Sequence, residues 1–97
     1  AHIQILDIGS GVGKFCLLGS VLSTSTFVGV EKRRNLFLQS ETTAKLLGLK
    51  TAHFVNDNIV NIQFSDYDAF YYFNPFILTL TLNGIAIVMM PTKKYYF

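Results

Sequence analysis

Residues 5–14 carry the sequence Ile5-Leu6-Asp7-Ile8-Gly9-Ser10-Gly11-Val12-Gly13-Lys14, in which an apolar run is followed by three glycines at alternate positions. The apolar run is typical of a buried parallel strand, and the helix-forming residues after it predict a strand, a tight turn and a helix. Glycine tolerates positive φ and has no Cβ, so a ligand can lie against the backbone of such a turn. The stretch therefore predicts a ligand-binding loop at the carboxyl end of a parallel sheet.

The spacing of the glycines separates this loop from two common nucleotide-binding loops. A dinucleotide fingerprint, G-x-G-x-x-G, that starts at Gly9 needs its last glycine where the chain has Lys14. A P-loop that ends in Gly13-Lys14 needs glycine at the position of Ile8 and Ser or Thr at the position of Phe15. The pattern here is instead D-x-G-x-G-x-G.

A second apolar segment, Phe27-Val28-Gly29-Val30-Glu31, also ends in an acid. Glu31 follows Gly13 by 18 residues, which is about the length of one helix and one strand. A parallel neighbouring strand would bring this carboxylate beside the glycine loop, where it can accept hydrogen bonds from both hydroxyls of a ribose. The two segments together predict a carboxylate beside the ligand-binding loop.

The remaining pattern alternates strands and helices, which implies right-handed crossovers and a parallel sheet. Gly48 is a plausible left-handed terminator of the second helix. We expect an α/β, three-layer Rossmann-like domain over residues 1–97, with strand order 3-2-1-4-5. The expected strands are 3–8, 27–31, 51–55, 69–73 and 85–90, the helices are 14–22 and 35–47, and a turn or short helix covers 59–64.

The glycine loop resembles motif I of class I S-adenosylmethionine-dependent methyltransferases. Together with Gly29-Val30-Glu31-Lys32 it looks especially like the Rossmann-type histone lysine methyltransferases and their bacterial relatives. The resemblance implies S-adenosylmethionine as cofactor, with Glu31 on the ribose and Asp7 aiding the loop and the ligand amino group. The cofactor contacts so expected are Asp7, Gly9, Ser10, Gly11, Gly13, Glu31, Lys32, Asp57, Asn58, Ile59 and Asn74.

The turn after the third strand, Asn56-Asp57-Asn58, admits two interpretations. The resemblance implies that Asp57 accepts a hydrogen bond from the adenine amino group and that Ile59 lies near the ring; Asn56 or Asn58 takes this place if the register slips. The alternative is an Asx turn, for which these residues are well suited.

A third motif, Asn74-Pro75-Phe76, resembles motif IV of amino-methylating enzymes, where it surrounds the target nitrogen. The resemblance makes Asn74, Pro75 and Phe76 the candidate catalytic residues. Only one proline is present, which departs from the family pattern, and an ordinary strand-ending turn is the alternative. We therefore predict a methyltransferase whose acceptor is left open between a protein lysine, another amine, nucleic acid and a small molecule.

The length of the chain bears on whether it forms a complete methyltransferase domain. The family fold has seven strands and about twice this length, so we expect an incomplete domain, with a naturally minimal domain as the alternative. If nothing follows the strand at 85–90 in the sheet, self-association through that edge is expected. A non-catalytic or incomplete S-adenosylmethionine- or nucleotide-binding module and a NAD-binding oxidoreductase domain remain the alternative functions.

The charge and the cysteine content bear on the expected partners and cellular location of the protein. The net charge of +2 gives no indication of nucleic acid, and no run approaches the roughly 18 apolar residues of a membrane helix. No signal peptide is recognisable. The single cysteine, Cys16, suits a reducing compartment, so a cytoplasmic or nuclear location is expected. His2 and His53 lack the spacing of metal ligands, and no metal site is expected.

Overall fold

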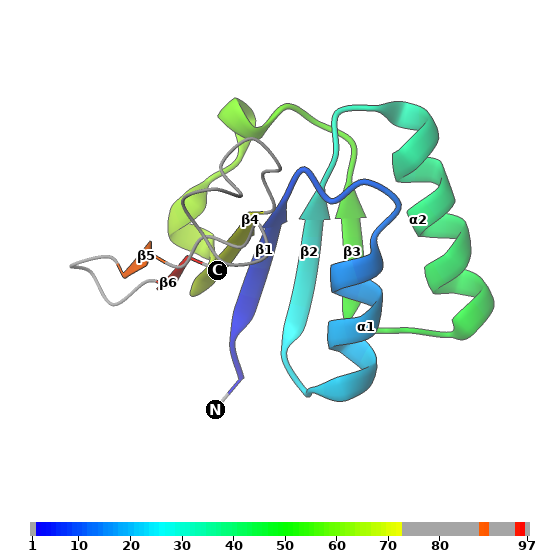
Figure 1. The fold of residues 1–97 in the computed structure, drawn as a ribbon, viewed down its shortest axis with the longest axis horizontal. Helices are drawn as coiled ribbons and strands as arrows, with labels where there is room; N and C mark the ends of the chain where they lie inside the picture. The colour runs from blue at the N-terminus through cyan, green and yellow to red at the C-terminus, as the bar shows by residue number, and fades with distance from the viewer. Residues whose placement is uncertain (1, 73–87, 90–94, 97) are drawn as a thin grey trace, which may run out of the picture.

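A computed structural model describes residues 2–72, 88–89 and 95–96. Its centre is a parallel sheet in which β1 (Gln4–Ile8) lies between β2 (Thr26–Val30) and β4 (Ala69–Tyr72), and β3 (Ala52–Val55) lies outside β2. The predicted order 3-2-1-4 is confirmed. The strands point the same way, so their carboxyl ends meet at one edge of the sheet (Figure 1).

Two helices connect these strands. Helix α1 (Lys14–Leu22) has the predicted bounds, and α2 (Arg34–Leu47) begins one residue earlier than expected. The predicted terminator, Gly48, has φ 63° and donates its amide to carbonyls of the last turn of α2. The segment 59–64, predicted as a turn or short helix, contains the single-turn 3-10 helix η1 (Ile59–Asn61). A second one, η2 (Phe64–Asp66), begins at the last residue of that segment and runs beyond it.

Side chains alternate between the two faces of the sheet, as the strand period requires. Ile5 and Phe27 pack with Cys16 of α1 and Ala44 of α2 on one face. The second face buries a separate cluster, packed with partly buried side chains from the segment around η1 and η2. Its buried members are Leu6, Val28, Val30 and Phe70. The α/β, Rossmann-like architecture is therefore confirmed.

Two short strands continue the sheet beyond β4. The strand β6 (Tyr95–Tyr96) pairs parallel with β4, and β5 (Val88–Met89) pairs antiparallel with β6. Of the strand predicted over 85–90, Val88–Met89 are described, and they pair with β6 and not with β4, where the order 3-2-1-4-5 expected them. The rest of that predicted strand lies outside the described residues. The expected self-association through that strand stays a prediction for the same reason.

Candidate functional site

The glycine loop lies at the carboxyl edge of the sheet and is held to the end of β2. The amides of Gly9 and Ser10 both donate to the carbonyl of Val30, at 2.9 and 3.0 Å. Gly9 and Gly11 have φ 70° and 60°, and a Cβ added to either would meet no atom of the described residues within 4 Å. These two glycines thus present bare backbone to open space, which is the surface that a closely bound ligand needs.

Gly13 serves a different purpose in the same loop. Its φ of 89° places it as the N-cap of α1, and an added Cβ would lie 2.8 Å from the ring of Phe54 and 2.9 Å from Ser40 Cβ. The glycine therefore allows the start of α1 to pack closely against β3 and α2. A contact of Gly13 with a cofactor stays a prediction.

Glu31 follows β2 directly and is 3% exposed. Its Oε1 accepts the amide of Gly11 at 2.8 Å, and its Oε2 accepts the amide of Arg33 at 2.9 Å. The Arg33 guanidinium adds bonds to both oxygens, at 2.9 Å from Nε and 3.3 Å from Nη2, although its own side chain is 60% exposed. Burial raises the pKa of Glu31, but the hydrogen bonds from Arg33 and Gly11 outweigh it and lower that pKa to about 2.

The turn after β3 has the side-chain-to-backbone hydrogen bonds of the Asx-turn interpretation, and the adenine contact of Asp57 stays a prediction. Asp57 Oδ1 accepts the Asn58 amide at 2.6 Å and Asn61 Nδ2 at 2.8 Å, and these bonds lower the Asp57 pKa. Asn58 Oδ1 accepts the Val60 amide at 3.1 Å and so caps η1. Asn56 donates Nδ2 to the carbonyls of Glu31 and Lys32, which fastens the turn to the end of β2.

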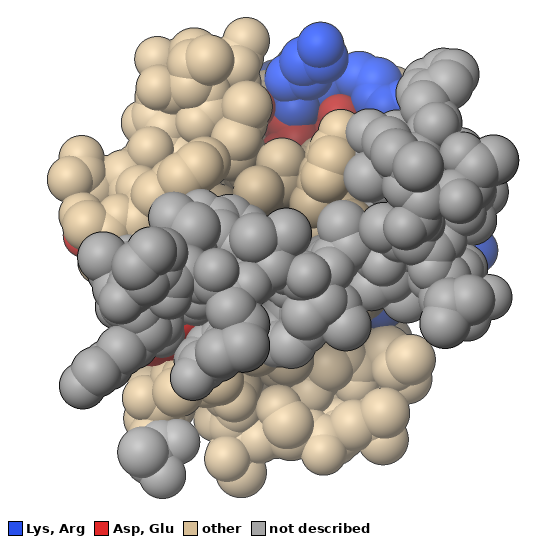
Figure 2. All heavy atoms as spheres, turned by 60° about the vertical axis from the view of Figure 1, so that its left-hand side comes forward, with Lys and Arg blue, Asp and Glu red and all other residues tan. Residues whose placement is uncertain are grey.

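Two cavities meet at Gly9, between the loop and the strand ends. One, of about 220 Å³, lies towards β2 and β3, and the other, of about 460 Å³, lies towards β4 and α1. Basic side chains gather near acidic ones at this end of the molecule (Figure 2). The first cavity is lined by Ile8, Gly9, Val30, Glu31, Lys32, Arg33, Asp57, Asn58 and Ile59. The second is lined by Asp7, Gly9, Ser10, Val12, Lys14, Phe15 and Tyr71.

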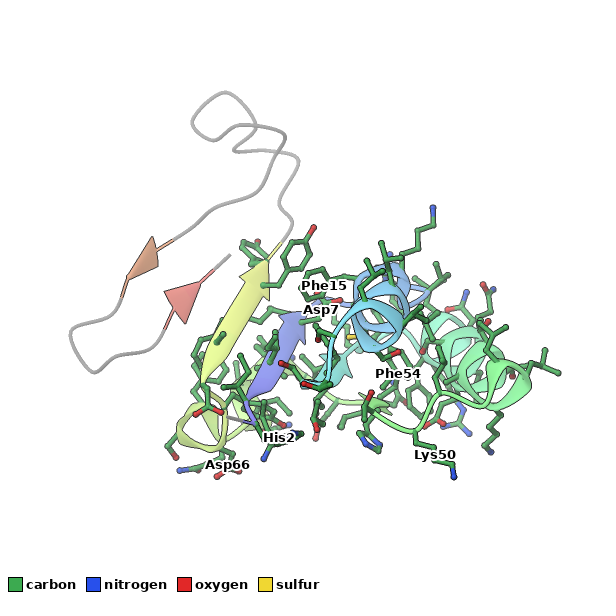
Figure 3. All side chains as sticks on the ribbon, turned by 90° about the horizontal axis from the view of Figure 1, so that it is seen from below. His2, Asp7, Phe15, Lys50, Phe54 and Asp66 are labelled. Carbon is green, nitrogen blue, oxygen red and sulfur yellow. The ribbon has the colours of Figure 1, made fainter. Side chains whose placement is uncertain are left out.

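Asp7 lines the second cavity and lies close to Phe15 (Figure 3). Its side chain is 3% exposed, and its Oδ2 is 3.8 Å from the thiol of Cys16. Burial raises the Asp7 pKa to about 7; the thiol bond opposes this rise and the charge of Glu31 adds to it. Tyr71 is the β4 partner of Asp7 in register, and its ring stacks on Phe15 with centroids 3.8 Å apart.

A third hollow, of about 550 Å³, runs along α1 towards its carboxyl end. It includes Leu18, Leu22 and Phe27, and its surface is almost wholly apolar. None of the described residues that line it carries a carboxylate, the acceptor that a ribose diol needs. The cavities at Gly9 are therefore the candidate site.

The structure thus brings most of the predicted cofactor residues to one edge of the sheet. Asp7, Glu31, Lys32 and the residues after β3 all line the two cavities. Asn74, Pro75 and Phe76 lie outside the described residues, so their catalytic role stays a prediction. Sequence reasoning did not identify Arg33, Tyr71 or the hydrogen bond between Cys16 and Asp7 as parts of the site. The Tyr71 and Cys16 contacts arise only when separate elements meet, and the Arg33 contact depends on the conformation of the turn after β2.

No model of a protein family matches the chain, and a search of curated proteins finds no match in sequence. Solved structures do match the fold. An RNA methyltransferase from Salinibacter ruber, in complex with S-adenosyl-L-homocysteine, is 19% identical, with a TM-score of 0.70 over 74% of this chain and 48% of its own. A protein-L-isoaspartate O-methyltransferase is 26% identical, with a TM-score of 0.65 over 72% of this chain and 23% of its own.

The described part of the chain has the fold of class I S-adenosylmethionine-dependent methyltransferases. The matched region spans half or less of these solved structures. The same fold occurs in the [4+2]-cyclase SpnF, which is 18% identical, with a TM-score of 0.67 over 72% of this chain and 27% of its own. Fold alone therefore leaves the reaction open, and the closeness to histone lysine methyltransferases stays a prediction. Within the described residues, no helix has the length and hydrophobicity to cross a membrane.

Proposed function

We propose that this chain binds S-adenosylmethionine and that the protein containing it transfers the methyl group to a nucleophile. The observation that carries the proposal is the buried Glu31 carboxylate, which faces the smaller cavity beside the exposed backbone of Gly9. A buried carboxylate at the end of the second strand suits the paired hydroxyls of a ribose. S-adenosylmethionine supplies a methyl group on a sulfonium centre.

The two cavities divide the expected ligand between them. The smaller one offers Glu31 for the ribose and Asp57 and Ile59 for the adenine. The larger one offers the Asp7 carboxylate for the ammonium group of the ligand and the stacked rings of Phe15 and Tyr71 for the rest of the ligand's amino-acid part. The role of these residues is to bind and orient the donor, because a displacement in line with the leaving group depends mainly on alignment.

Without a ligand, both carboxylate oxygens of Glu31 already accept hydrogen bonds from groups of this chain. Each of its oxygens carries a backbone amide bond and a bond from the Arg33 guanidinium. The guanidinium is mostly exposed and its ion pair is weak, so the ribose hydroxyls can replace it at little cost. The two amide bonds remain and keep the carboxylate oriented.

Calorimetric titration with S-adenosylmethionine, S-adenosyl-L-homocysteine and NAD tests the ligand. We expect the first two to bind and Glu31→Gln to weaken both by about 5- to 150-fold, because one of the two acceptor oxygens becomes an NH2 donor and the ribose hydroxyls lose a charged acceptor. Glu41→Gln, the same change on α2, is the matched control. A folded protein that binds neither sulfur ligand, or that binds NAD equally well, contradicts the proposal.

Transfer of a labelled methyl group tests the activity separately. The protein is incubated with methyl-labelled S-adenosylmethionine and cell extract, and label is counted in the protein, RNA and small-molecule fractions. We expect label in one fraction that is lost with Glu31→Gln. Binding without any labelled fraction would favour the non-catalytic module instead.

A further inference from the structure

The carboxylate of Asp7 is an incompletely satisfied buried group. It is 3% exposed and lines the larger cavity. Within the described residues, the thiol of Cys16 is its hydrogen-bond donor, at 3.8 Å from Oδ2, and no donor meets Oδ1. Buried carboxylates normally collect several strong donors. A group left with one weak donor, beside a cavity, is available to a positively charged ligand group.

The thiol of Cys16 is held in place by the core. Cys16 is wholly buried in the first turn of α1, among the side chains that α1, α2 and the sheet share. Burial raises the pKa of this thiol, and the charge of Asp7 raises it further. The sulfur therefore keeps its proton at physiological pH and remains a donor.

We propose that Cys16 is a positioning residue for ligand binding: its buried S–H, donated to Asp7 Oδ2, holds the carboxylate so that Oδ1 is directed to the ammonium group of the ligand. The inference rests on the proposed function, because the ammonium group belongs to the amino-acid part of S-adenosylmethionine. The inference adds Cys16 to the residues that support ligand binding, although Cys16 belongs to the core and is not among the described residues that line the cavity.

The surroundings of Asp7 determine how the pairing can be observed. The charge of Glu31 acts on Asp7 from the end of β2, and Tyr71 is its partner on β4. Lys14, at the start of α1, is exposed and lines the same cavity. Burial raises the Asp7 pKa to about 7, and the thiol bond is the contribution that lowers it. Removal of the bond must therefore move the ionisation of Asp7 to higher pH, and a stronger donor must move it to lower pH.

Three substitutions at one position separate hydrogen bonding from packing. Cys16→Val fills the space without a donor, Cys16→Ala leaves a small gap without a donor, and Cys16→Ser supplies a stronger donor. In each protein, carbon NMR follows the Asp7 carboxyl from pH 5 to 9 without ligand, with Asp7→Asn to assign the signal. Calorimetry then measures S-adenosyl-L-homocysteine affinity over the same range.

We expect the Asp7 midpoint to rise by at least ~0.5 pH unit in the Val and Ala variants and to fall in the Ser variant. The ligand affinity of the wild type should rise with pH, and each variant's affinity curve should move with its midpoint. A merely structural role of Cys16 would lower stability without moving the midpoints in opposite directions.

Identical midpoints in the wild type and all three variants would overturn the proposal, whether or not any ligand binds. If the Asp7 titration midpoints move but the S-adenosyl-L-homocysteine affinity does not change with pH, Asp7 does not contact the ligand. That result would overturn the role of Cys16 in ligand binding. If the folded wild type binds no S-adenosyl-L-homocysteine at any pH, the proposed function fails; moving midpoints would then leave only the pairing of Cys16 with Asp7.

Discussion

The side chain of Ser10 occupies the space above Gly29. A Cβ at position 29 would lie 2.6 Å from Ser10 Cβ and 2.7 Å from Ser10 Oγ. Ser10 Oγ is buried, and it has no hydrogen-bond partner among the described residues. The glycine loop therefore rests directly on the backbone of β2, and the position of the loop depends on the absence of a side chain at Gly29.

Gly29→Ala should lift the loop away from the strand. We expect a loss of about 1–3 kcal/mol in the free energy of unfolding, because the loop backbone must shift. S-adenosyl-L-homocysteine affinity should fall at least ~10-fold, since a displacement of about 1 Å disturbs alignment. Gly48→Ala is the matched control: its left-handed φ of 63° costs about 1–2 kcal/mol, and no atom of the described residues beyond its chain neighbours lies within 4 Å of an added Cβ. Equal ligand affinity in both variants would contradict the coupling.

Gly11→Val should abolish binding in a protein that still folds. An added Cβ lies more than 4 Å from every described atom beyond its chain neighbours, and the side chain built on it fills the space expected for the ligand. A β-branched residue at φ 60° also adds strain, which we expect to lower stability by roughly 1–3 kcal/mol. Titration with S-adenosyl-L-homocysteine and denaturant unfolding measure the two effects. Full affinity in the folded variant would show that the loop backbone does not approach the ligand.

Arg33→Ala should increase ligand affinity, by up to ~5-fold. The guanidinium and the ribose hydroxyls compete for the same Glu31 oxygens, and an exposed ion pair contributes about 0–1 kcal/mol. Arg34→Ala, on the next residue, is the control. Weaker binding by Arg33→Ala alone would mean that the guanidinium assists the ligand instead.

Glu31→Gln should change the acid stability of the protein. The Glu31 pKa is lowered from 4.5 to about 2, so the ionised carboxylate stabilises the folded state above pH 4.5. That stability is lost as the pH falls from about 4.5 to about 2. The variant should show a flatter decline in this window when unfolding free energy is measured by denaturant at several pH values, and Glu41→Gln should follow the wild type. An unchanged slope would show that Glu31 is not stabilised by its hydrogen bonds.

Asp7→Asn should change the pH dependence of stability in the opposite direction from Glu31→Gln. Burial raises the Asp7 pKa from 3.8 to about 7, so the wild type loses stability as the pH rises between these values. Above pH 7 the variant should be more stable than the wild type, by up to roughly 4 kcal/mol, and near pH 3 the difference should vanish. The variant should also bind S-adenosyl-L-homocysteine more weakly. Equal stabilities at pH 8 would show that the carboxylate is well solvated.

The sequence by itself predicted the elements that depend on local pattern. The apolar run before Gly9 predicts β1, the glycines predict the loop, and the apolar segment before Glu31 predicts β2, because strand period and positive φ are properties of the chain near each residue. The bounds of α1 and the left-handed end of α2 at Gly48 follow from the same local rules. The edge of the sheet that holds the candidate site could be placed for the same reason.

The tertiary structure alone decided which of these residues act on one another. Nothing in the sequence pairs Cys16 with Asp7 or places Ser10 over Gly29, because each contact depends on how a helix or loop packs against the sheet. Arg33 is close to Glu31 in the chain, yet only the turn after β2 aims its guanidinium at both carboxylate oxygens. The ionisation of Asp7 is likewise a property of the packed core, since burial and neighbouring charges are set by elements distant in sequence.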